Sequence, residues 1–199
     1  MNTSNNKKIP VFPLGLVVLP GTIQSLQIFE PRYIDMVKSC MKDTSGFVIT
    51  LQSKSEGDIE YGLIKQGTYV EIIDFNNNSN GLLGITVKAI NKVEIKDIFQ
   101  QKDMLHLATI KPLTDPLVAD QALIAQHPEL LNILIQLKDH PRIKILPLDI
   151  DLTSADSVAY HLGGLIPLNS KEKQTILEAF DASQRMNILS RLINKLSEK

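Results

Sequence analysis

The stretch Ile9-Pro10-Val11-Phe12-Pro13-Leu14-Gly15, followed by Leu19-Pro20-Gly21 and then by Ile28-Phe29-Glu30-Pro31-Arg32-Tyr33, decides the fold of this 199-residue chain. It joins an apolar strand, two corners made by proline and glycine, and a helix that begins at Pro31, where the missing amide hydrogen of proline costs nothing. Local propensity alone rarely produces this order. We therefore predict a buried strand over residues 9–19, a second strand over residues 23–29 and a helix after Pro31.

Apolar side chains recur at helical spacing behind Pro31, at Tyr33, Met36, Val37, Cys40 and Met41. This spacing predicts an amphipathic helix of about three turns. Cys40 lies on its apolar face, which indicates a core thiol and not a reactive nucleophile. Because Cys40 is the only cysteine, the chain can form no internal disulfide, and nothing in its cysteine content indicates an oxidising compartment.

The middle of the chain changes to short β-rich runs, which we expect over residues 47–51, 59–64, 68–75, 82–89, 91–98 and 105–110. An asparagine-rich loop over residues 76–81 is typical of a hairpin connection. No segment of helical length separates these runs, so they favour a closed or half-closed, mostly antiparallel barrel over a parallel sheet.

After Pro112 and the pair Asp115-Pro116, the periodicity is helical to the end of the chain. Helices are expected over residues 119–126, 128–138, 171–179 and after caps at Thr153 and Asp181, with Ser170 capping the third, and Pro128 either kinks one helix or begins a second. In the last helix Arg185, Lys195 and Lys199 are expected outside. The predicted class is α+β: a disordered tail over residues 1–8, a β-barrel with one early helix over 9–113, and an α-helical bundle over 114–199.

The charge pattern disfavours nucleic acid as a partner. The 22 acidic and 21 basic residues nearly cancel, with no basic cluster, and only 5% of residues are aromatic. Residues 1–8 are polar and the apolar run behind them is cut by prolines and glycines, so we expect neither a signal peptide nor a membrane span. A cytoplasmic protein is the resulting expectation, with its oligomeric state left open.

The sequence contains no recognisable catalytic or metal-binding motif. The four histidines, at positions 106, 127, 140 and 161, stand apart without metal-ligand spacing. No glycine is followed by lysine, which excludes a phosphate-binding loop, and no Gly-x-Ser-x-Gly elbow is present. We therefore expect no catalytic residues, no metal, no cofactor and no enzymatic activity.

The opening stretch resembles the Lon protease N-terminal domain family, whose members begin with the same strand, Pro-Gly corner and Phe-Glu-Pro-Arg-Tyr helix start. Further similarity lies at Tyr61-Gly62, in the strand 67–72 (with Val70 where alanine is usual), and in the helical segments 165–177 and 184–186, so the resemblance covers residues 9–196. It implies a PUA-like barrel followed by a helical bundle. It also implies a stand-alone, bacterial-type member without the ATPase and protease domains.

One departure from the family concerns a strand that usually contains glycine followed three residues later by arginine. This chain has Ala89 and Lys92 there. Loss of the glycine indicates a different bulge or backbone approach, and lysine cannot make the planar bidentate contact of arginine. Contacts that the family makes through that arginine are therefore not carried over.

The resemblance implies a non-catalytic module that binds exposed apolar or unfolded polypeptide, or a protein partner. Two interpretations compete for the residues that would form such a site. Phe12, Leu14, Phe29 and Tyr33 either line an apolar groove or belong to the core. Glu30 and Arg32 either orient a ligand or are structural, with the acid near the helix N-terminus and the arginine tying the helix to the barrel.

Two other functions remain alternatives. One is an RNA-related role through the PUA-like barrel, against which the flat charge distribution stands. The other is a cryptic small-molecule or hydrolase site, which would require a concave pocket with converging polar groups.

Overall fold

The computed structural model describes residues 8–53, 60–77 and 81–197. Their contacts divide the chain into two compact units: the first contains the residues up to Gly15 and Gln24–Leu113, and the second contains Leu16–Ile23 and the residues from Thr114 onward. The tail expected over residues 1–8 lies outside the described residues except for Lys8. This lysine is exposed, and its Nζ lies 3.7 Å from the centre of the Phe99 ring.

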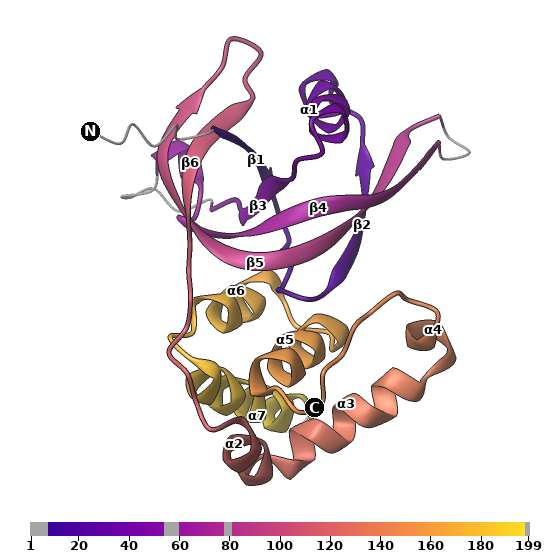
Figure 1. Cartoon of the computed structure of the whole chain (residues 1–199), viewed down its shortest axis with the longest axis vertical. Helices are drawn as coiled ribbons and strands as arrows, with labels where there is room; N and C mark the ends of the chain where they lie inside the picture. Colours follow the sequence, from indigo (N-terminus) through magenta and orange to yellow (C-terminus); the bar gives the residue numbers. More distant parts are fainter. Residues whose placement is uncertain (1–7, 54–59, 78–80, 198–199) are drawn as a thin grey trace. The chain divides into compact units, whose positions relative to one another are not determined.

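In the part of the chain that the structure describes, the first unit contains six strands, one α-helix and one short 3₁₀ turn (Figure 1). The elements are β1 (Ile9–Leu14), β2 (Ile23–Ile28), α1 (Pro31–Lys42), β3 (Phe47–Leu51), the 3₁₀ turn η1 (Glu60–Gly62), β4 (Gln66–Asn77), β5 (Leu83–Gln100) and β6 (His106–Pro112). The predicted first strand is too long, because regular pairing stops at Leu14. The segment that follows it belongs to the second unit.

The strands form one sheet in the order β2-β5-β4-β3-β1-β6. β1 and β3 pair in parallel, whereas the pairs of β4 with β3, β4 with β5, and β6 with β1 and with β5 are antiparallel. β5 is long enough to pair with β4 along its first part and with β6 along its last part. The pairings therefore run from β5 through β4, β3, β1 and β6 back to β5.

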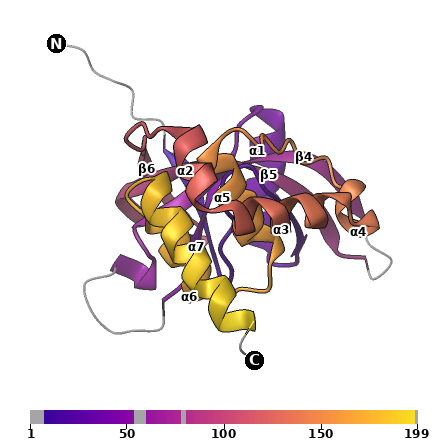
Figure 2. The ribbon, with the colours of Figure 1, turned by 90° about the horizontal axis from the view of Figure 1, so that it is seen from below.

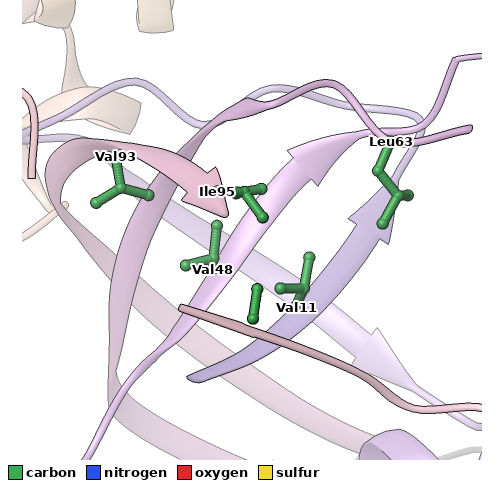
Figure 3. Packing of buried hydrophobic residues seen from close by; sticks show 6 residues of the cluster. Val11, Val48, Leu63, Val93 and Ile95 are labelled. Atoms are coloured by element: carbon green, nitrogen blue, oxygen red, sulfur yellow. The ribbon is translucent and has the colours of Figure 1, made fainter. Parts of the chain in front are cut away.

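Small β-branched and aliphatic side chains fill the space that these strands enclose (Figure 3). The cluster comprises Val11, Val48, Leu63, Val93, Ile95 and Ala108, each at most 5% exposed. Four different strands contribute to it, so burial of this apolar surface is available only when the non-local strand pairs have formed. The predicted α+β class is confirmed.

α1 matches its prediction closely. Pro31 occupies the first turn, and Tyr33, Met36, Val37 and Cys40 are buried at the expected spacing. Cys40 is a core thiol whose Sγ lies 3.6 Å from the carbonyl oxygen of Gly46. Met41 was expected on the same face but is 40% exposed, because the helix ends one residue later.

Two predicted strands, 82–89 and 91–98, are one continuous strand, β5. On β4, Tyr69 pairs with Asn91 and Val70 pairs with Ala89, so Ile90 has no opposite residue and forms a bulge. The extra residue of the bulge shifts the alternation of buried and exposed side chains by one position, which is why the sequence pattern predicts two strands there. Ala89 and Lys92, where the chain departs from the family it resembles, lie beside this bulge and are both buried.

The prediction of a strand over residues 59–64 is wrong for residues 60–62, and residue 59 lies outside the described residues. Glu60–Gly62 is a 3₁₀ turn in which Tyr61 and Gly62 have φ values of 57° and 67°. Two successive residues in this left-handed backbone turn the chain and interrupt an extended strand. The hairpin connection expected over residues 76–81 is confirmed by the pairing of Asn77 with Leu83, and residues 78–80 lie outside the described residues.

The second unit is helical, and its helices are α2 (Asp120–Gln126), α3 (Pro128–Asp139), α4 (Pro141–Lys144), α5 (Ala155–Leu165), α6 (Ser170–Glu178) and α7 (Ala182–Ser197). Pro128 begins a helix and does not kink one. α5 packs against α2, α3, α6 and α7, and Figure 2 shows α7 running across this group. None of the helices in the described ranges is both long and apolar enough to cross a membrane.

The helix caps differ from their predictions by one residue at two of three positions. Ser154, and not Thr153, caps α5, because the backbone N–H and hydroxyl of Thr153 both donate to the Asp151 carboxylate. Asn169, and not Ser170, caps α6. At α7 the expected cap is confirmed, since Asp181 Oδ1 accepts from the Gln184 amide at 2.8 Å.

Arg185 contradicts the prediction that it lies outside. Its side chain is fully buried and forms ion pairs with Asp115, 2.6 Å away, and Asp156. The guanidinium lies 4.1 Å from the centre of the Tyr160 ring, and it donates to the carbonyl oxygens of Ile176 and Ala179. The two carboxylates make burial of the charge tolerable, and neither is near Arg185 in sequence.

The segment Leu16–Ile23 joins the helical unit through specific contacts with α5. Gly21, with φ at 79°, brings its carbonyl oxygen within 3.1 Å of His161 Nε2. A Cβ atom at Gly163 would lie 3.0 Å from the Leu19 side chain, so a glycine permits this close approach. The Pro20-Gly21 corner of the opening stretch thus packs against α5 of the second unit.

Candidate functional site

The six residues expected to bind a partner all line one cavity, which has a volume of about 320 Å³. We call it the β1–α1 cavity, and the residues around it are Phe12, Pro13, Leu14, Gln27, Ile28, Phe29, Glu30, Arg32, Tyr33, Gln52, Tyr61, Leu63 and His106. β1 contributes three of these and the end of β2 contributes two. Because Pro31 starts α1 directly behind β2, the first turn of the helix is held at the same wall.

The aromatic residues of the cavity divide into a buried floor and an exposed rim. Phe12 and Tyr33 are 6% and 5% exposed, and their ring centres lie 4.1 Å apart. Phe29 and Tyr61 are 68% and 48% exposed. The core interpretation therefore applies to Phe12 and Tyr33, and the groove interpretation applies to Phe29. A bound apolar group would bury the most exposed apolar surface at the rim.

Arg32 is held by partners within its own unit. Its Nε donates to Glu30 Oε2 at 2.8 Å, Nη1 donates to the Met104 carbonyl oxygen at 2.9 Å, and the guanidinium lies 4.7 Å from the centre of the Tyr33 ring. Glu30 is the N-cap residue of α1, but its carboxylate faces Arg32 and makes no cap hydrogen bond. The pair therefore ties α1 to the turn between β5 and β6.

His106, the first residue of β6, is a cavity residue that sequence analysis considered only as a metal ligand. It is 7% exposed, its ring centre lies 5.1 Å from that of Tyr61, and its Nε2 lies 3.2 Å from Gln100 Nε2. Its Nδ1 is buried and has no hydrogen-bond partner among the described residues. No local sequence pattern distinguishes this histidine, because pairing of β5 with β6 and the fold of η1 assemble its surroundings.

Burial lowers the pKa of His106, and the nearby charge of Arg32 lowers it further. Burial likewise raises the pKa of Tyr33. Both shifts favour neutral side chains at neutral pH, because an apolar environment penalises the charged form. Glu30 and Arg32 are thus the charged groups of the described lining, and they compensate each other.

We expect the pKa of His106, followed by NMR of the imidazole Cε1–H, to lie below its ordinary value of 6.5. In the variant Arg32→Gln the pKa should rise, because one source of repulsion is lost, yet stay below 6.5, because burial is the larger cause. Lys38→Gln, which changes an exposed lysine on the same helix, is the control and should leave the pKa of His106 unchanged. A His106 pKa at or above 6.5 in the unmodified protein would contradict this picture of the cavity.

His106 is the one histidine of the described lining. The described lining includes no serine or cysteine whose hydroxyl or thiol this histidine could deprotonate. No group of three or more His, Cys, Asp or Glu side chains in the described part of the chain could hold a metal ion. The cavity combines an aromatic rim with two exposed glutamine side chains and one buried imidazole.

A second cavity in the same unit, of about 350 Å³, lies between the end of α1 and β4. Phe75 on its rim is 57% exposed. None of the predicted site residues lies there, which makes this cavity a useful comparison for binding experiments.

A family model described as the ATP-dependent protease La (LON) substrate-binding domain matches residues 8–195. The chain belongs to this family. The resemblance of its opening stretch to Lon N-terminal domains is therefore confirmed, and the similarity lies with the substrate-binding domain and not with the protease domain.

Curated relatives of this LON substrate-binding domain are whole Lon proteases. It is 22% identical to the Lon protease of Bacillus thuringiensis (strain Al Hakam) over 208 residues and 25% identical to that of Brevibacillus choshinensis over 206 residues. These alignments cover 100% and 98% of this chain but only 25% and 26% of the relatives. The chain thus spans about a quarter of the length of these proteins.

Two solved structures share its fold. The Lon N-terminal domain protein from Xanthomonas campestris has a TM-score of 0.70 at 24% identity, over 93% of this chain and 98% of that one. The N-terminal domain of Mycobacterium avium complex Lon protease has a TM-score of 0.69 at 18% identity, over 92% and 96%. At these identities the likeness establishes the fold alone.

Proposed function

We propose that this LON substrate-binding domain is a non-catalytic module that recognises exposed apolar or unfolded polypeptide segments, or a protein partner that presents one. The β1–α1 cavity is its binding site, with Phe12, Leu14, Phe29, Glu30, Arg32 and Tyr33 among the contact residues. The observation that carries this proposal is the pair of exposed aromatic side chains, Phe29 and Tyr61, above an apolar floor in one cavity.

The position of β2 beside the cavity favours a ligand in extended conformation. β2 stands at one end of the strand order, so among the described residues one of its edges has no partner strand. Gln27 and Ile28, at the end of β2, line the β1–α1 cavity. An extended segment paired with this edge would direct alternate side chains toward the cavity, which gives affinity through backbone hydrogen bonds with little demand on sequence.

Within this proposal the sheet is a PUA-like barrel and the second unit an α-helical bundle. They fold as subdomains over residues 9–113 and 114–199, except that the segment Leu16–Ile23 belongs to the helical unit. The partner is a polypeptide and not nucleic acid, since the net charge is −1 and Arg32 already faces Glu30. The chain acts in the cytoplasm and contributes recognition without proteolysis. The description of its family as a substrate-binding domain supports this role, because such a domain contacts the protein that is to be degraded.

The test uses a permanently unfolded protein, reduced and carboxymethylated α-lactalbumin, and an array of short peptides that tile its sequence. We expect saturable binding to the apolar peptides. The variant Phe29→Ser should weaken binding roughly tenfold, as loss of an aromatic side chain that the ligand buries does. Isothermal titration or fluorescence anisotropy provides the dissociation constants.

Phe75→Ser is the matched control, because Phe75 has a similar exposure on the same unit but borders the other cavity. It should bind like the unmodified protein. If Phe75→Ser weakens binding while Phe29→Ser does not, the site is the second cavity. Absence of saturable binding to any peptide or to the unfolded protein would reject the proposed function.

A further inference from the structure

His106 lines the β1–α1 cavity, its Nδ1 is buried without a hydrogen-bond partner among the described residues, and the neighbouring Gln100 determines which of the two ring nitrogens carries the hydrogen. Gln100 Nε2 lies 3.5 Å from the carbonyl oxygen of Met104 and 3.2 Å from His106 Nε2. A carbonyl oxygen can only accept, so the amide group facing both atoms must be the NH₂ and not the oxygen. Gln100 therefore donates to His106 Nε2.

A neutral imidazole that accepts at Nε2 must carry its hydrogen on Nδ1. The low pKa of His106, caused by burial and by Arg32, keeps the ring in this neutral form. Nδ1–H is thus a donor, and it has no acceptor among the described residues while being shielded from solvent. A buried donor without an acceptor is unfavourable, so an acceptor that reaches Nδ1–H gains affinity from the hydrogen bond it makes.

Tyr61 is the side chain whose ring contacts the imidazole, with the two ring centres 5.1 Å apart. It is 48% exposed, and its backbone φ of 57° lies in the left-handed region, which is unfavourable for a tyrosine. Gly62, also left-handed, follows it and allows the chain to turn there. Tyr61 is therefore held over His106 by a strained turn and not by a regular element, so its displacement needs no strand pair to break.

We infer that His106 Nδ1–H is the anchoring donor for a main-chain carbonyl oxygen of the bound polypeptide, reached when an apolar side chain of that polypeptide displaces Tyr61 from the imidazole. This inference rests on the proposed function and assigns its site a polar contact. The ligand it selects is an extended segment with a bulky apolar residue next to an accessible carbonyl group. Apolar contacts with Phe29 and Tyr61 supply affinity, and the histidine sets the position of the backbone.

The first experiment measures the tautomer and its response to ligand. In the free protein, ¹⁵N-¹H correlation of the histidine rings should show the hydrogen of His106 on Nδ1. Saturation with the tightest-binding peptide of the α-lactalbumin array should move the Nδ1–H proton downfield. A hydrogen on Nε2, or an unchanged Nδ1–H signal in the saturated complex, would overturn the inference.

The second experiment removes the donor and the acceptor separately. His106→Phe keeps a ring beneath Tyr61 but has no donor, and we expect it to weaken binding of that peptide roughly tenfold. His106→Asn places an amide donor near the position of Nδ1 and should retain most of the affinity. A set of peptides in which one amide bond at a time is replaced by an ester, whose carbonyl is a weaker acceptor, locates the anchored carbonyl group. One ester peptide should bind the unmodified protein more weakly than the all-amide peptide does. The same ester peptide and the all-amide peptide should bind His106→Phe equally well.

The outcomes separate the two proposals. If the peptide binds and Phe29→Ser weakens it, while His106→Phe and every ester peptide bind normally, the cavity binds polypeptide and the histidine anchor is wrong. If no peptide binds, the proposed function fails. Peptides with a carboxylate side chain could instead bind preferentially, and this preference could be lost in His106→Phe. The acceptor for Nδ1–H would then be an acidic side chain and not a main-chain carbonyl, and the inference would be rejected.

Discussion

Replacing Arg185 by methionine is expected to destabilise the helical unit by about 3–5 kcal/mol, the cost of breaking a buried ion pair by removing one partner. Methionine retains much of the apolar contact with Tyr160 but leaves Asp115 and Asp156 without the guanidinium. The Asp115 side chain is only 12% exposed and cannot be well hydrated where it lies. Asp156, at 43%, recovers water more easily and accounts for less of the loss.

Urea unfolding followed by circular dichroism at the helical wavelength measures this effect. Lys195→Met is the matched control: it removes a cation from the same helix, but from an exposed ion pair with Glu172 at 3.7 Å. Such surface pairs contribute about 0–1 kcal/mol, so the control should stay within that range. Equal free energies of unfolding for Arg185→Met and Lys195→Met would show that the buried cluster does not stabilise the unit.

A double variant distinguishes two causes of the destabilisation: loss of the attraction between Arg185 and Asp115, and the cost of leaving the Asp115 carboxylate buried without a cation. Combining Arg185→Met with Asp115→Asn should be less destabilising than the sum of the two single changes, because the neutral amide no longer needs the cation. The two residues lie in contact, so this departure from additivity is the direct measure of their coupling. Strict additivity would contradict the interpretation.

Replacing Gly46 by alanine is expected to destabilise the first unit by at least about 3 kcal/mol, at or beyond the upper end of ordinary overpacking. The added Cβ would lie 2.0 Å from the carbonyl oxygen of Val70 and 2.7 Å from the Tyr69 ring. Relief is difficult, because Val70 is paired with Phe47 on β3 and with Ala89 on β5. The Gly46 amide would also lose its 2.8 Å hydrogen bond to the Tyr69 hydroxyl.

Gly15→Ala is the control within the same unit, because a Cβ there would have no neighbour within 4 Å. Its stability should be unchanged or up to about 1 kcal/mol higher, since alanine restricts the unfolded chain. Thermal and urea unfolding of both variants provide the comparison. A Gly46→Ala protein as stable as Gly15→Ala would show that β4 can move away from the loop, contrary to its pairing on both sides.

The local elements of the first unit follow from the sequence with little error where short-range chemistry decides them. Pro31 begins α1, and the periodic apolar residues behind it determine its buried face. Phe47–Leu51 is a strand as predicted. The errors occur where a distant partner overrides a local pattern: β5 continues through Asn91 because β4 pairs on both sides of the bulge, and η1 is not a strand because Tyr61 and Gly62 adopt left-handed backbone.

The candidate site was accessible to sequence reasoning only in part. Phe12, Leu14, Phe29, Glu30, Arg32 and Tyr33 lie in or beside one continuous stretch, so a pattern spanning the first strand to the first helix could select them together. Tyr61 and His106 join them through η1 and through the β5–β6 pairing, which local propensity does not reveal. No sequence signal separates His106 from the other three histidines.

The sequence by itself determined the family, the change from strands to helices after Pro112, and the residues that start and bury α1, because these are encoded in local patterns of residues. Only the tertiary structure decided which side chains share an environment: the burial of Arg185 between Asp115 and Asp156, and the placing of His106 beneath Tyr61 in the β1–α1 cavity. Burial and pairing of polar groups depend on partners far apart in the chain, and the energy of desolvating them exists only once those partners have met.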